Sequence, residues 1–195
     1  MRQIKIANII LSILIIFVAL APVLASTHIS EVSGSLEKIE VWTYKPPPKD
    51  NDSATLGVVV SSPRTIKYEV AVAYTITVQD FIGQSPEAWK YCFAHARVWV
   101  EVNGVEVWSD EVETTDSILV DEHYMYTKVL RGSVNASQLT VTVAEKAWFE
   151  YAGFGASGYA EAYVYDYYVK IEYPDVVEVE VIDSKGRRLA GAPSL

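Results

Sequence analysis

The sequence predicts an all-β fold, an antiparallel β-sandwich or jelly roll of about ten strands with one short helical turn. Apolar and polar residues alternate through much of the 195-residue chain, which is the period of strands with one buried face. Asn103-Gly104 separates two valine-rich alternating runs. This dipeptide indicates a hairpin, because a type I′ turn needs positive φ at both central residues. Helical periodicity is nearly absent.

The alternation and the turn residues place the elements in order. Proline-rich residues 45–53 are expected to form an exposed loop, because prolines remove ladder donors. The helical turn is expected at 83–91, where Ser85 suits the cap and Pro86 the first helical position. Strands are expected at 37–44, 54–62, 65–78, 91–102, 105–113, 117–122, 124–130, 137–152, 156–173 and 176–183, followed by a short terminal strand after "SKGRRL".

The strand at 65–78 has two different faces. One face is apolar and the other carries small residues at its centre, Ala71 and Ala73. We expect that small face to pack closely against something, either another sheet or another subunit. The apolar face consists of Ile66, Tyr68, Val70, Val72, Tyr74, Ile76 and Val78.

The N-terminus has the features of a secretory signal peptide over residues 1–25. Arg2 and Lys5 precede an apolar run, and cleavage is expected after Ala25. A retained membrane anchor, or a pilin-type helix cut after Lys5, is the alternative. Residues 26–36 are then a flexible Ser-rich arm and 37–195 a single domain. The protein is therefore expected outside the cell or at its surface, with no membrane association after cleavage.

Composition excludes some partners. The net charge of −9 argues against nucleic acid, which needs basic patches, and suits an extracellular protein with a cationic or basic partner. Cys92 is the single cysteine, so no internal disulfide can form. No nucleophile-and-base motif, zinc-protease motif or phosphate loop occurs, and we expect a non-enzyme without a required cofactor.

Two metal sites can be considered. Calcium could bind an acidic group around the hairpin, although no calcium-loop spacing occurs and the charges are more typical of a solvated sheet edge. Copper is less expected, because the first two of its candidate ligands would point to opposite faces of a strand. The calcium candidates are Glu101, Glu106, Asp110, Glu111 and Glu113, and the copper candidates are Cys92, His95, His123 and Met125. Asn51 and Asn135 fit the N-glycosylation pattern and are expected in loops.

The hairpin carries the candidate partner-binding surface. A two-residue turn would place Trp99 opposite Trp108 and Glu101 opposite Glu106 on one face, with the valines on the other. The two indoles could be covered by residues 80–91 of the same chain, by another subunit, or by a sugar stacked on an aromatic platform.

In layout the chain resembles secreted fibre subunits of the camelysin/TasA kind and similar archaeal pilus proteins. "VLAST", then "SGSLEKIEVWTY", then strands such as "TIKYEVAVAYTI" follow the order of signal, donor strand and jelly roll in those proteins. The resemblance implies assembly into extracellular filaments and transfers no site residues. We therefore expect a structural or adhesive cell-surface protein that self-associates by strand addition. The alternative is a carbohydrate-binding module with Trp99 and Trp108 as its platform.

Overall fold

The computed structural model describes residues 27–43, 50–81, 92–115, 118–152, 157–174, 178–182 and 188–189. These residues form an antiparallel sheet of nine strands, so the predicted all-β antiparallel class is confirmed. The helical turn predicted at 83–91 lies outside the described residues. The strands are β1 (His28–Gly34), β2 (Ile39–Trp42), β3 (Asn51–Phe81), β4 (Cys92–Val102), β5 (Val105–Glu113), β6 (Val120–Ala152), β7 (Ser157–Tyr173), β8 (Glu178–Ile182) and β9 (Arg188–Leu189).

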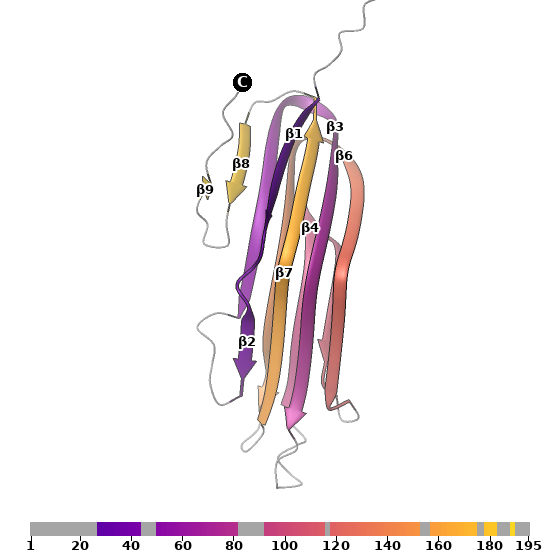
Figure 1. Ribbon diagram of the computed structural model, residues 1–195. Coiled ribbons are helices and arrows are strands. Elements are labelled where there is room, and N and C mark those ends of the chain that lie inside the picture. The colour runs from indigo at the N-terminus through magenta and orange to yellow at the C-terminus, as the bar shows by residue number, and fades with distance from the viewer. Residues whose placement is uncertain are drawn as a thin grey trace, which may run out of the picture.

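Two very long strands organise the sheet. β3 and β6 pair along nearly their whole length, and the pairing register shifts between Val59 and Arg64 of β3. Figure 1 shows both strands arching over at one end of the molecule. Because of this arch, the sheet turns back on itself and its two halves lie one in front of the other. Several predicted strands are therefore single strands that continue through the arch.

We name the two halves after their position in Figure 1. The front layer contains β1, β2, β7, residues 64–81 of β3 and residues 120–136 of β6. The back layer contains β8, residues 51–59 of β3, residues 138–152 of β6, β4 and β5. In the described part of the chain, residues 120–136 of β6 pair with β3 alone and thus form a free edge.

The core lies between the layers. Alternation sets one face of each strand inward, and the buried side chains come mainly from valine and alanine. The apolar face predicted for residues 65–78 is fully buried except for Tyr68, which is partly buried. Small residues such as Ala96 of β4 and Ala162 of β7 are completely buried. Burial of the apolar side chains between the layers supplies the main stabilisation of the fold.

Residues predicted to form a flexible arm belong instead to the sheet. His28–Gly34 forms β1 and pairs along seven positions with the end of β7. β1 is an edge strand with little buried surface, since Ser30 is its one buried residue and Ile29 is 55% exposed. The Ser30 hydroxyl shares a hydrogen bond of 2.6 Å with the Tyr173 hydroxyl. The arm was predicted from its serine content, which does not reveal that a neighbouring strand edge is available.

The predicted hairpin turn is present, but its outer register is different. Asn103 and Gly104 have positive φ values of 53° and 73°, as a type I′ turn requires. Glu101 pairs with Glu106 as predicted, but a β-bulge then leaves Val107 unpaired. Beyond the bulge every side chain of β5 changes face relative to β4. Trp99 consequently pairs with Ser109, and the predicted Trp99–Trp108 pair is wrong.

The bulge also corrects the valine face. Val98, Val100 and Val102 of β4 are buried, whereas Val105 and Val107 of β5 are exposed. The predicted glycosylation positions likewise need correction, because Asn51 begins β3 and Asn135 lies within β6 rather than in loops. Both asparagines are exposed.

Candidate binding surface

Four tyrosines lie together on the outer face of the front layer. Tyr124 and Tyr126 of β6 meet edge to face with 4.7 Å between ring centroids. Tyr124 stacks on Tyr165 of β7 at 6.1 Å, and Tyr165 contacts Tyr163 at 6.1 Å. Tyr124 is 53% exposed and Tyr126 is 75% exposed. We call these four residues the tyrosine cluster. A continuous aromatic surface of this kind, open to solvent, is a candidate binding platform.

Small residues of β3 allow the cluster to form. Thr75 of β3 lies between Tyr124 of β6 and Tyr163 of β7. Strands two apart in a sheet are separated by roughly 9–10 Å, so rings from β6 and β7 can meet only above a low central strand. The Tyr165 hydroxyl crosses that strand and donates to the backbone carbonyl of Met125 at 3.2 Å. The small face predicted to pack against another sheet or subunit is thus flanked by the chain's own tyrosines.

Two bulges set the positions of the tyrosines. β6 has an extra residue opposite Ala73, at Tyr126 and Thr127, and β7 has one at Tyr165. Each bulge adds an outward residue to its strand. The β7 bulge is held from inside, because the Val164 amide donates to a carboxylate oxygen of Glu145 at 2.5 Å. Glu145 comes from the back layer and has no exposed surface, so a buried carboxylate fixes the position of Tyr165.

The surroundings of the tyrosine cluster are acidic. Burial, followed by a hydrogen bond with Tyr124, raises the pKa of Tyr165 to about 12, so its hydroxyl remains protonated at neutral pH. Glu122 lies one row below Tyr124 on the same outer face, and Asp166 is exposed beside Tyr165. The arrangement presents apolar ring faces together with hydroxyl donors and carboxylate acceptors.

The two hairpin tryptophans do not form a shared platform. Both are half-buried, and the bulge places them on opposite faces of the hairpin. Trp99 lies on the outer face of the back layer, where its indole N–H donates to Glu101 at 2.8 Å and the Arg97 guanidinium lies 5.6 Å from its ring centroid. Arg97 also pairs with Glu106 at 2.6 Å, which offsets the predicted repulsion between the two facing glutamates.

Trp108 packs against other parts of the chain itself, and residues 82–91 of the segment predicted to cover it lie outside the described residues. Its ring contacts buried Tyr74 at 5.6 Å, and the Lys128 ammonium lies 5.7 Å from its centroid. Next to it, Asp110 of β5 accepts hydrogen bonds from the Tyr74 hydroxyl and from His123 of β6, the latter at 2.9 Å. Asp110 therefore joins the edge strands of the two layers.

The calcium candidates are not assembled into a site. Glu101 and Glu106 are engaged by Trp99 and Arg97, and Asp110 is engaged at the layer edge. Glu111 and Glu113 lie 3.7 and 3.6 Å from the imidazole of His95. Over the residues that the structure describes, no group of three or more His, Cys, Asp or Glu side chains is placed to hold a metal ion.

The copper candidates whose side chains the structure describes do not come together. His95 is buried on the outer face of the back layer and stacks on Trp148, with 4.9 Å between ring centroids. His123 is occupied with Asp110 at the layer edge. Met125 lies beside His123 in β6 but contributes its backbone carbonyl to Tyr165. The side chain of Cys92 lies outside the described residues.

The tyrosine cluster was missed at the sequence level, although a signal for it exists. Tyr124 and Tyr126 in "HYMYTK", and Tyr163 and Tyr165 in "YVYDYY", are each separated by one residue, which is the spacing of side chains on one face of a strand. What the sequence does not reveal is that these two segments flank the same residues of β3. That pairing joins parts of the chain about forty residues apart.

Comparisons with known proteins give no assignment. No protein-family model matches the chain, and no curated protein matches it. Among solved structures, dimeric latent PorU from Porphyromonas gingivalis is 8% identical with a TM-score of 0.32, and the match covers 80% of this chain and 14% of PorU. TmCBM61 in complex with β-1,4-galactotriose is 16% identical with a TM-score of 0.24, over 76% of this chain and 88% of that one. Likenesses this distant carry no argument here.

Within the residues described, no helix is both long and apolar enough to cross a membrane.

Proposed function

We propose that this protein is an extracellular adhesive protein, without catalytic activity, that binds polysaccharide through the tyrosine cluster. The observation that supports the proposal is the run of four tyrosine rings in contact on the open face of the front layer, with Tyr124 and Tyr126 mostly exposed. We further infer that the folded-over sheet is a β-sandwich or jelly roll, as the sequence predicts, and that it serves as a rigid support.

The chemistry of the surface suits sugar rings. A pyranose has an apolar face of C–H groups and a rim of hydroxyls, and a tyrosine offers an apolar body with a polar tip. The carboxylates of Glu122 and Asp166 can accept hydrogen bonds from sugar hydroxyls, and the Thr75 and Thr77 hydroxyls can donate them. A few polar groups around an apolar surface are typical of small-molecule sites. The open face of the sheet favours an extended chain over a small ligand enclosed in a cavity.

Aromatic substitution tests this proposal directly. Tyr126→Ala and Tyr124→Ala should abolish retardation of the protein in gels that contain a bound polysaccharide, such as xylan, galactan or cellulose derivatives. Val105→Ala is the matched control, because Val105 is 65% exposed and lies on the other layer. Trp99→Ala tests the platform predicted from the sequence and should leave binding unchanged. If a broad glycan array and these gels detect no ligand, the proposal is wrong.

Self-assembly by strand addition is a second proposal, favoured by the edges of the front layer. β1 is a shallow strand at one edge, and residues 120–136 of β6 leave the other edge free in the described part of the chain. Unpaired edges are templates for strand addition. β1 could leave β7 and complete the sheet of a neighbouring copy. Deleting residues 26–36 should then abolish polymers seen by electron microscopy, and polymers that persist would exclude this role for the N-terminal segment.

A further inference from the structure

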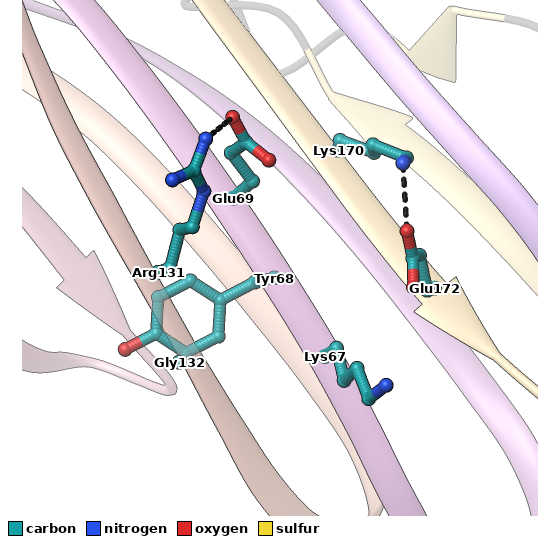
Figure 2. Close-up of a pocket in the computed structure, with 7 residues that line it drawn as sticks. All are labelled: Lys67, Tyr68, Glu69, Arg131, Gly132, Lys170 and Glu172. Atoms are coloured by element: carbon teal, nitrogen blue, oxygen red, sulfur yellow. Dashed lines mark hydrogen bonds and ion pairs between the residues drawn. The ribbon is translucent and has the colours of Figure 1, made fainter.

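A charged pocket lies on the same outer face as the tyrosine cluster, nearer the arch. It encloses about 220 Å³ between β3, β6 and β7. Figure 2 shows its side chains on three adjacent strands. A second hollow of about 160 Å³ continues from it and shares Lys67 and Glu172. We call the first hollow the charged pocket. Its lining residues are Lys67, Tyr68, Glu69, Arg131, Gly132, Lys170 and Glu172.

The charges in the pocket sum to a net positive value. Arg131 pairs with Glu69 at 2.8 Å, and Lys170 pairs with Glu172 at 2.6 Å. Lys67 is a third cation, and no carboxylate lies within ion-pair distance of it among the residues that the structure describes. The surrounding protein has a net charge of −9. Three basic side chains around one hollow are therefore a local exception in an acidic molecule.

The two ion pairs leave their charges available. The Arg131 side chain is 71% exposed, and exposed pairs contribute only about 0–1 kcal/mol. The guanidinium can therefore turn toward another carboxylate at little cost. It also presents a planar set of donors that suits a carboxylate in two-point contact. An anion that enters between Lys67 and Arg131 would neutralise the surplus charge.

The packing of the sheet behind the pocket depends on one glycine. An added Cβ at Gly132 would lie 2.4 Å from the Tyr68 hydroxyl and 2.5 Å from its ring. The Tyr68 ring can lie against the edge strand because Gly132 has no side chain. The ring packs against the core, on the face of the sheet opposite to Lys67 and Glu69. Tyr68 thus fills the inner side of the sheet behind the charged rim.

The pocket and the tyrosine cluster lie on one line. Glu69, Ala71 and Thr75 point outward along β3, with Glu69 at the pocket and Thr75 beside the tyrosine cluster. At roughly 3.3 Å per residue, the two sites are about 20 Å apart, which an oligosaccharide can span. Tyr168 lies beside Ala71, and its hydroxyl donates to Glu31 at 2.8 Å. An extended glycan on the cluster would therefore reach the pocket with a neighbouring unit or branch.

We propose that the charged pocket binds the carboxylate of an acidic sugar belonging to the polysaccharide that stacks on the tyrosine cluster. This inference rests on the proposed function and adds the ligand class: a glycan with neutral rings and an occasional uronic acid. Lys67 and Arg131 hold the carboxylate. The acidic surroundings disfavour a densely charged polyanion, because most of the face repels it.

The experiment compares two matched glycans by calorimetry, an unsubstituted xylo-oligosaccharide and the same oligosaccharide with one glucuronic acid branch. The wild-type protein should bind the branched ligand about five- to tenfold more tightly, as expected for one added charge-assisted contact. Lys67→Gln should remove this preference while leaving affinity for the neutral ligand unchanged. Lys146→Gln is the control, because Lys146 is a partly exposed lysine on the back layer, away from the charged pocket.

The outcomes separate the two proposals. If both ligands bind equally, or if Lys67→Gln leaves the preference intact, the acidic-sugar inference is wrong and the proposed function stands. If neither oligosaccharide binds, and the glycan array and polysaccharide gels also detect no ligand, free glucuronate is titrated with NMR detection of the Lys67 and Arg131 side chains. Shifts that disappear in Lys67→Gln would retain the carboxylate site and refute only polysaccharide binding. Absence of such shifts would refute both.

Discussion

Replacing Glu145 with leucine should destabilise the protein and disturb the tyrosine cluster together. The carboxylate is fully buried and accepts the Val164 amide at 2.5 Å from the opposite layer. A buried amide left without its hydrogen-bond partner costs about 1–3 kcal/mol. We therefore expect the free energy of unfolding to fall by roughly 1–3 kcal/mol. For a domain of this size that lowers the Tm by roughly 2–12 °C.

Urea denaturation followed by tryptophan fluorescence measures this loss. Glu145→Gln is the matched control, because its amide oxygen can still accept from Val164, and it should lose less than half as much stability. Polysaccharide binding should weaken in Glu145→Leu, since the β7 bulge that presents Tyr165 loses its internal support. An equally or more stable Glu145→Leu protein would refute the reasoning. It would mean that the cost of burying the carboxylate exceeds the benefit of its hydrogen bond.

Three further predictions concern alkaline pH, the layer edge and the pocket. The pKa of Tyr165 is raised from its ordinary value of 10.0 to about 12, and that of Tyr74 is also raised, chiefly by burial. The free energy of unfolding should therefore be unchanged below pH 10 and should fall as the pH rises toward 12, because the folded state resists loss of the tyrosine protons. Urea titrations at each pH would measure this fall. Asp110→Ala should lower the free energy of unfolding by about 1–3 kcal/mol, because the buried Tyr74 hydroxyl loses its acceptor, and an unchanged urea midpoint would contradict this. Gly132→Ala should displace the Tyr68 ring behind the pocket and lower the free energy of unfolding by about 1–3 kcal/mol, as urea denaturation would reveal.

The sequence predicted local features of the fold well. Alternation correctly identified the all-β class and the buried face of residues 65–78, because both depend on the period of two along one strand. The Asn103-Gly104 turn was predicted correctly because its chemistry lies in two adjacent residues. Such features need no knowledge of distant parts of the chain.

Non-local features were missed or wrong. The bulge at Val107 allows Asp110 and Trp108 of β5 to contact Tyr74 of the front layer, and the residue spacing of the hairpin does not predict it. Strand ends were also assigned at polar residues such as those at 61–65, where β3 in fact bends and continues. A strand can pass through a polar, solvent-exposed arch when a partner strand bends with it.

The candidate site shows the same limit. The sequence directed attention to Trp99 and Trp108, because large indoles in a clear hairpin are easy to recognise. The tyrosines gain their importance only when β6 and β7 flank β3, and the charged pocket likewise combines residues from all three strands. A surface of this kind is a property of the pairing pattern rather than of any segment.

The pairing of β3 with β6 also has a consequence for how the chain folds. Asn51 pairs with Lys146 and Gln79 with Val120, so no tight turn can start this ladder and the loop between them must close first. Proteins dominated by such contacts cross their folding barrier slowly. The β4–β5 hairpin lies inside that loop and forms from neighbouring residues. We expect it to be the early nucleus, with the two long strands joining late and together.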